Sequence, residues 1–154
     1  MLGSLVTNAS YLYSILQKQC AENHVIYDLS PFLDLIYIKS HRDTLCRLLT
    51  SSHTPHVESG RWSRNPTVPR ERRYCFNCNA KVEDEFHFVF ECPIYSLLRR
   101  QLIPRYFRER PSMFKFINLL NSGCKKKLIG LAKYVYKANI LRSQTITDRQ
   151  APLW

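Results

Sequence analysis

The chain has 154 residues, of which 45% are hydrophobic, and its 23 lysines and arginines against 12 acidic residues give a formal net charge of +11. This length suits one small domain with a core. No apolar run is long enough for a transmembrane helix, and the N-terminal stretch lacks the basic start of a secretory signal, so we expect a nuclear or cytoplasmic protein without a membrane partner. In these compartments thiols stay reduced, and clustered cysteines favour a metal site over disulfides.

The first 69 residues predict a helical scaffold followed by a linker. We expect helices over 11–19 and 30–49 within a scaffold that spans 1–50. The second helix has a clear start, because Ser30 suits the N-cap and Pro31 the first helical position. Residues 51–69 contain three prolines and a glycine, which is typical of a linker or loop.

The segment 70–103 carries the most informative motif, two cysteines, a histidine and a third cysteine with the spacing C-x2-C-x8-H-x4-C. Its residues are Cys75, Cys78, His87 and Cys92. Zn²⁺ takes four such ligands in a tetrahedron, and Cys3His is one of its structural ligand sets. Asn79 suits the left-handed turn that closes such a knuckle. The alternative is a set of unpaired core cysteines with a surface histidine.

A short helix is expected to carry the histidine of this motif. Asp84 or Glu83 can cap it, and Cys92 then lies just past its end. Glu83, Asp84 or Glu85 is also a candidate hydrogen-bond partner for His87, because metal-binding histidines commonly donate their second ring nitrogen to a carboxylate.

Further helices are expected after the motif. Pro93 begins one that Pro104 ends, and its predicted apolar face consists of Ile94, Leu97, Leu98 and Leu102. The basic segment 104–142 predicts helices over 111–121 and 124–142, and 143–154 is expected to fray. The last helix has an apolar face of Leu128, Leu131, Val135 and Ala138 and an opposite stripe of Lys126, Lys133 and Lys137. The predicted fold class is mostly α, a small helical domain with an inserted zinc-knuckle hairpin.

Positive charge is concentrated in the half that carries the motif. Residues 1–60 have four basic and five acidic side chains, a net charge of −1, whereas 61–154 have nineteen and seven, a net charge of +12. Such a field attracts polyanions, and RNA or DNA is the first candidate partner; an acidic protein or a solvated surface without a ligand is the alternative. Arginine and lysine bind phosphate, and exposed aromatic rings stack on bases. The candidate contact residues are Arg61, Trp62, Arg64, Arg70, Arg72, Arg73, Phe76, Arg99, Arg100, Lys126, Lys133 and Lys137.

The remaining cysteines and histidines predict no chemistry with comparable strength. Cys46 with His53 and His56 has the ligand types for a second metal site, and a Cys–His pair has the residue types of a nucleophile and its base. The Cys–His pair has no evident orienting group or oxyanion site. We therefore predict no catalytic residue and no small-molecule substrate.

Several segments together resemble one known family, the C-terminal zinc-knuckle region of reverse transcriptases encoded by non-LTR (LINE-type) retrotransposons. The resemblance covers roughly residues 30–142 and is carried by the metal motif with Leu45-Cys46-Arg47-Leu48-Leu49, Gly60-Arg61-Trp62, Glu83-Asp84-Glu85-Phe86-His87-Phe88, Glu91-Cys92-Pro93 and Leu131-Ala132-Lys133-Tyr134-Val135-Tyr136-Lys137-Ala138. It implies zinc as cofactor, a role in binding the element's RNA or the target DNA, and a reverse transcriptase core as a further partner.

The chain also departs from that family. The paired aspartates of the polymerase palm are not found, and the only adjacent acidic residues are Glu83-Asp84-Glu85. There is no room for a polymerase or an endonuclease in 154 residues. We therefore expect a binding module and not an enzyme. The alternatives are a zinc-stabilised protein-interaction module and a non-functional retroelement remnant.

Overall fold

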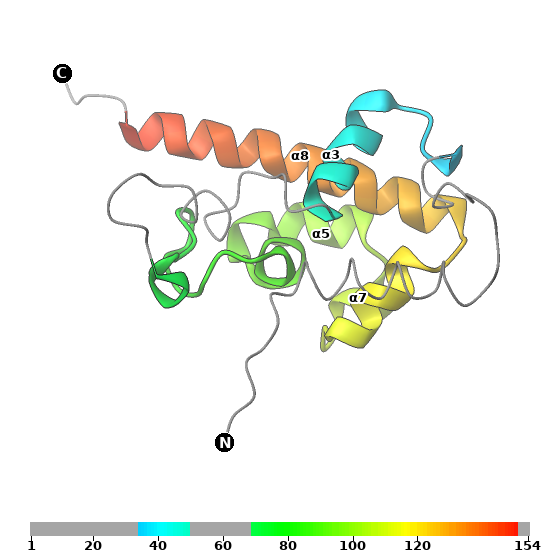
Figure 1. The fold of residues 1–154 in the computed structure, drawn as a ribbon, viewed down its shortest axis with the longest axis horizontal. Coiled ribbons are helices and arrows are strands. Elements are labelled where there is room, and N and C mark those ends of the chain that lie inside the picture. The colour runs from blue at the N-terminus through cyan, green and yellow to red at the C-terminus, as the bar shows by residue number, and fades with distance from the viewer. Residues whose placement is uncertain (1–33, 50–68, 151–154) are drawn as a thin grey trace.

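The computed structural model describes residues 34–49 and 69–150 (Figure 1). The predicted helix over 11–19, the Ser30–Pro31 cap and the predicted linker apart from its last residue lie outside these ranges. So do Arg61, Trp62 and Arg64, and the side chain of Arg70 is also outside the description.

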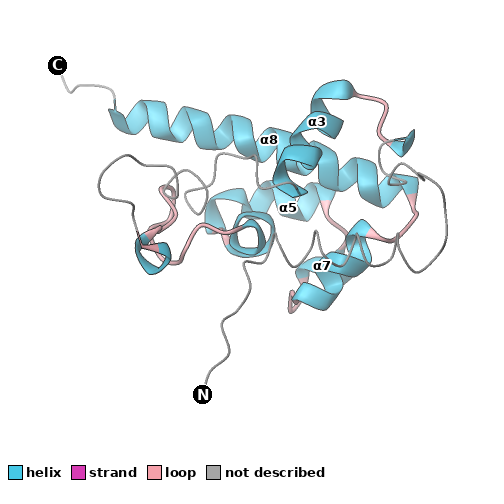
Figure 2. Cartoon of the chain, viewed as in Figure 1, coloured by secondary structure: helices cyan, strands magenta, loops and turns pink. Residues whose placement is uncertain are grey.

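Helices dominate the described chain, as predicted, and it contains no strand (Figure 2). In chain order the elements are α3 (Lys39–Leu49), the short helical turns η1 (Arg70–Arg72), η2 (His87–Glu91) and η3 (Pro93–Tyr95), and α5 (Ser96–Leu102), α6 (Arg105–Arg108), α7 (Met113–Leu120) and α8 (Lys125–Gln150). Within 34–49 and 69–150, no helix combines the length and the apolar content that crossing a membrane requires.

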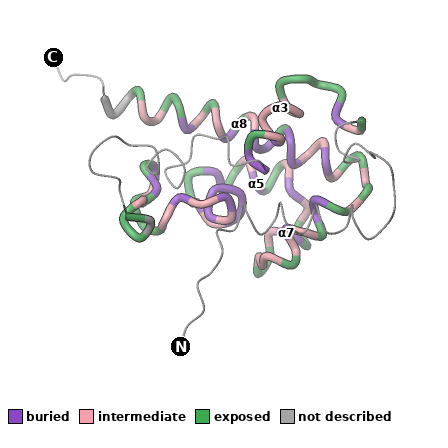
Figure 3. The backbone as a smooth tube through the Cα atoms, viewed as in Figure 1, coloured by how far each residue is buried: buried purple, intermediate pink, exposed green. Residues whose placement is uncertain are grey.

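Helix α8 is the central element of this fold, because α3, α5 and α7 all pack against it (Figure 1). Its predicted apolar face is confirmed, since Leu128, Leu131, Val135 and Ala138 are all buried. Lys126, Lys133 and Lys137 are exposed, also as predicted. Figure 3 shows buried residues gathered where α8 meets α3 and α5. The 3.6-residue period of the sequence therefore sufficed to predict which side of α8 is buried and which is exposed.

The C-terminal end of α8 was predicted incorrectly. The helix continues to Gln150 and does not end near Arg142. Its last turns contain polar and β-branched residues, which have low helix propensity. Their hydroxyl groups bond back to the helix, because Thr145 Oγ1 donates to the carbonyl of Leu141 at 2.9 Å and Thr147 Oγ1 to that of Ser143 at 3.0 Å. The tertiary anchor at Arg142, described below, then holds this part of the helix in place.

The predicted helix over 30–49 is also interrupted, because residues 36–38 are not helical. Ile36 and Leu45 are nine residues apart, so a continuous helix would place them on opposite sides, about 180° apart. Both are nevertheless buried, at 1% and 0% exposure. The break lets both side chains reach the core. The carbonyl of Ile36 accepts a hydrogen bond from Arg42 Nη1 at 3.5 Å in place of a helical amide.

The predicted apolar face of the helix after Pro93 is half confirmed, because Leu98 and Leu102 pack against the core. The other two predicted residues are exposed. Ile94 and Leu97 are 40% and 66% exposed, and the buried side chains of this segment are Tyr95, Arg99 and Ile103. The first turn after Pro93 is the tighter 3₁₀ type, which changes the angle between successive side chains before α5 begins.

Helix α7 lies within its predicted range, and Ser112 Oγ caps it by accepting from the amide of Lys115 at 3.3 Å.

Gly130 allows α8 to approach α5 closely, because a Cβ atom at this position would lie 2.5 Å from the carbonyl oxygen of Leu102. Backbone must move to admit the methyl group, which should cost about 1–3 kcal/mol. Alanine offsets about 1 kcal/mol of this cost through its higher helix propensity. We therefore expect Gly130→Ala to lower the free energy of unfolding by up to about 2 kcal/mol. Urea denaturation measures the difference. Ser143→Ala, an exposed change on the same helix, is the control, and a Gly130→Ala protein as stable as this control would contradict the close approach.

Candidate metal centre

A short hairpin places the first two cysteines of the motif. Tyr74 pairs with Val82 in an isolated antiparallel bridge, and the amide of Cys75 donates to the carbonyl of Lys81 at 2.8 Å. The turn closes where the amide of Asn79 donates to the carbonyl of Cys75 at 2.8 Å. Asn79 has φ of 54°, which confirms the predicted left-handed conformation. Asparagine tolerates this conformation better than most other residues.

A π-helical turn, η2, places the other two candidate ligands. Asp84 Oδ1 accepts a hydrogen bond from the amide of His87 at 2.8 Å, so Asp84 is the cap that the sequence predicted. The amide of Cys92 donates to the carbonyl of His87 at 2.8 Å, which closes an i to i+5 turn. In an α-helix, residues five apart point about 140° away from each other. The wider turn brings both side chains to one side, and Cys92 lies just past its end, as expected.

Two side chains from other helices complete this turn. Tyr134 Oη of α8 donates to the carbonyl of Phe88 at 2.8 Å. Arg99 of α5 donates from Nε to the carbonyl of Val89 and from Nη2 to that of Cys92, both at 2.8 Å. Buried carbonyl groups require such partners. Arg99 is therefore only 8% exposed and holds the metal-site backbone, which corrects its prediction as a nucleic-acid contact.

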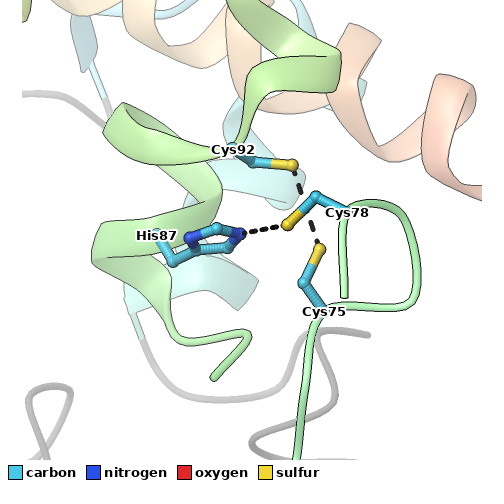
Figure 4. Close-up of side chains that lie close together, drawn as sticks. All are labelled: Cys75, Cys78, His87 and Cys92. Carbon is cyan, nitrogen blue, oxygen red and sulfur yellow. Dashed lines mark hydrogen bonds between the residues drawn. The ribbon is translucent and has the colours of Figure 1, made fainter. Parts of the chain in front are cut away.

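The four candidate ligands come together as a tetrahedral metal site requires (Figure 4). Their ligand atoms all lie within 4.8 Å of one another. Cys75 Sγ is 3.9 Å from Cys92 Sγ, and Cys78 Sγ is 3.3 Å from His87 Nε2. With the bond lengths usual for zinc, a tetrahedron places two sulfurs about 3.8 Å apart and a sulfur and a nitrogen about 3.6 Å apart. The residues therefore fit a tetrahedral ion such as zinc.

The burial of these residues argues against the alternative of a surface histidine. His87 is 3% exposed, and Cys75 and Cys92 are 1% and 0% exposed. The pKa of the Cys75 thiol is lowered, chiefly by a hydrogen bond from Cys92, and the pKa of Cys92 is raised by the same bond. The cluster therefore favours one thiolate, the form of cysteine that binds metals.

Glu91 places a carboxylate beside the second ring nitrogen of His87. Its Oε2 lies 3.4 Å from His87 Nδ1, and its Oε1 accepts from Lys81 Nζ at 2.9 Å. The sequence had suggested Glu83, Asp84 or Glu85 as the hydrogen-bond partner of this nitrogen, but the structure brings Glu91 to ion-pair distance and gives Nδ1 no hydrogen bond within the described residues. Glu91 follows His87 by four residues on the same helical turn, and that spacing was the signal that could have identified it.

A buried ion pair joins the hairpin to α8. Arg142 donates from Nε and Nη2 to the two carboxylate oxygens of Glu83, both at 2.8 Å. Glu83 Oε1 also lies 3.8 Å from Cys75 Sγ. Three thiolates, a neutral histidine and Zn²⁺ together carry a charge of −1, and Arg142 compensates the additional negative charge of Glu83 beside them. No local pattern could have paired residues 59 positions apart.

The predicted nucleic-acid contacts are distributed over several surfaces. Arg72, Phe76, Arg100 and the lysine stripe of α8 are exposed, and Arg73 is half-buried. The ring of Phe76 lies 5.5 Å from the guanidinium carbon of Arg142, next to the metal centre. Cys46 is half-buried and is not in a disulfide, and His53 and His56, which were considered with it, lie outside the described residues.

Comparisons of the chain with protein-family models, with curated proteins and with solved structures found no match.

Proposed function

We propose that this chain is a zinc-binding module that binds nucleic acid through a basic surface centred on α8, in a role like that of the retrotransposon region it resembles. Zn²⁺ would be held by Cys75, Cys78, His87 and Cys92. All four positions are filled by protein, so the ion would have a structural role. The chain's own residues then present the binding surface.

The observation that carries the nucleic-acid part is the unbalanced charge of α8. Its sequence has seven basic residues and one acidic residue. Lys126, Lys133 and Lys137 are exposed, and none of them forms an ion pair with a described residue. Three lysines also begin the helix, where the helix dipole is already positive and where an acidic residue would be favourable. This arrangement of positive charges lowers the stability of the free protein and favours the binding of a polyanion.

Fluorescence anisotropy of the zinc-loaded chain tests this function with single-stranded RNA, single-stranded DNA and duplex DNA at several salt concentrations. We expect salt-dependent binding that is lost on chelation. Replacing Lys126, Lys133 and Lys137 by glutamine should make the log–log salt slope for single strands shallower by about 2, because three phosphate contacts are removed. The zinc content should not change.

The matched control removes charges that are already neutralised. Lys39 is paired with Asp43 and Arg105 with Glu109, so glutamine at positions 39 and 105 should alter the slope far less. A folded, zinc-containing protein that binds none of the three probes would refute the nucleic-acid function. An acidic protein would then be the partner to seek.

A further inference from the structure

A second group of cations lies far from the candidate metal centre, around the start of α8. Lys125 begins α8 and Arg142 contacts the hairpin, so the two positions are about 25 Å apart along the helix. From residue 92 to residue 147 the chain has twelve basic residues, and Glu109 is its single acidic residue. That carboxylate is occupied by Arg105.

Exposed tyrosines lie within this group of cations. Lys125 Nζ lies 4.1 Å from the ring centroid of Tyr37, and Lys115 Nζ lies 4.7 Å from that of Tyr106. With a lysine on one side, Tyr37 is still 70% exposed and Tyr106 is 59% exposed. We call Tyr37, Tyr106, Lys115 and Lys125 the tyrosine–lysine face.

Lys127 links the start of α8 to the second half of this face. Its Nζ lies 5.5 Å from the ring centroid of Phe107, and that buried ring packs edge-on against Tyr106 at 5.0 Å. Lys125 and Lys127 are two positions apart on α8, so their side chains point to opposite flanks of the helix, and the exposed Lys126 lies between them. In Figure 1 the segment before α3 and helix α7 lie on opposite sides of the first turns of α8.

The connection between α6 and α7 is held in one conformation. Lys115 Nζ donates to the carbonyl of Tyr106 at 2.9 Å and to that of Glu109 at 2.6 Å. The next residue, Arg110, is exposed and has φ of 45°, a left-handed conformation that is uncommon outside glycine. A surface ordered in advance loses less conformational entropy when it binds.

We infer that the tyrosine–lysine face is a binding site for single-stranded nucleic acid, in which unpaired bases stack on Tyr37 and Tyr106 while phosphates contact the neighbouring cations. This inference rests on the proposed function and specifies its ligand. A single strand offers both negative phosphates and flat, accessible bases, which match exposed rings interleaved with cations. A duplex keeps its bases stacked within the helix, and an acidic protein offers no bases.

The test uses the zinc-loaded full chain with both tyrosines replaced by leucine, Tyr37→Leu with Tyr106→Leu. The probes are a single-stranded RNA, a single-stranded DNA, the corresponding duplex, and heparin as a polyanion without bases. We expect binding to the single strands to weaken at least about tenfold, since stacked bases contribute substantially to such complexes. Binding to the duplex and to heparin should stay within about twofold.

Matched variants separate stacking from loss of surface or fold. Replacing both tyrosines by tryptophan should retain or tighten single-strand binding, and Leu97→Ala, an exposed apolar change on α5, should leave it unchanged. If the double leucine variant loses its circular dichroism spectrum, each tyrosine is replaced singly. Because both are exposed, each single variant tests the site.

These measurements distinguish base stacking at the tyrosine–lysine face from general nucleic-acid binding by the chain. If the natural chain binds single strands and the folded leucine variant binds them equally well, or if heparin binding falls to the same extent, stacking at this face is wrong and general nucleic-acid binding stands. Weaker single-strand binding by the tryptophan variant would also overturn stacking at this face. If the natural chain binds no nucleic acid, both are wrong.

Discussion

Removal of zinc by a strong chelator should abolish the native structure of residues 70–103. The hairpin in this segment has one isolated bridge, Tyr74 with Val82, and no sheet to stabilise it. Binding of structural zinc typically contributes about 10–16 kcal/mol, which is as large as the roughly 5–15 kcal/mol that stabilises an entire domain. Hydrogen exchange with and without chelator, together with metal analysis, measures the effect, and we expect one zinc ion per chain.

The chain contains a matched control for this experiment. Cys92→Ser removes a candidate ligand and should lose zinc and protection together. Cys124 is a free cysteine outside the cluster, so Cys124→Ser should retain both. Because thiolates and a neutral histidine bind the ion, affinity should also fall as the pH is lowered. Equal zinc content in the two serine variants would show that the cluster is not the metal site.

Breaking the pair between Glu83 and Arg142 should produce the second large effect. We expect Arg142→Gln to lower the free energy of unfolding by about 3–5 kcal/mol, because it removes the guanidinium that pairs with the buried carboxylate of Glu83. Glu83 is 0% exposed and lies 3.8 Å from Cys75 Sγ, so water cannot replace the guanidinium and the thiolate nearby repels the charge. Urea denaturation of the zinc-loaded protein measures the change.

Two further variants separate the loss of the pair from the loss of a charge. Arg100→Gln removes an exposed arginine from α5 and should change stability by no more than about 0.5 kcal/mol. Combining Glu83→Gln with Arg142→Gln removes the buried negative charge together with the guanidinium and should recover part of the lost stability. If Arg142→Gln has no larger effect than Arg100→Gln, the pair does not hold α8 to the hairpin.

This ion pair connects the candidate metal centre with the basic helix α8. Arg142 is the residue of α8 that bonds to Glu83 in the hairpin, and its guanidinium also lies against Phe76. Loss of the hairpin would therefore leave Arg142 without its partner and release the end of α8. For this reason we expect chelation to weaken nucleic-acid binding even though the lysine stripe itself does not touch the candidate metal centre.

Much of the candidate centre was predictable from local sequence. The spacing of Cys75, Cys78, His87 and Cys92 identified the four residues whose ligand atoms meet. The left-handed Asn79, the cap at Asp84 and the two faces of α8 followed from residue type and helical period, which act over a few neighbouring positions. The sequence alone therefore determined the ligand set and the direction in which α8 presents its lysines.

Other features depended on contacts between distant segments. Ile36 interrupts a predicted helix because the core has room for both Ile36 and Leu45, and Arg99 turns inward because the π turn exposes carbonyl groups that need donors. Glu83 finds Arg142 across 59 positions. A local pattern records which residues can be buried or bonded, but the partner is decided by which surfaces meet. Only the tertiary structure could show that the candidate metal centre and the basic helix are joined by one buried ion pair.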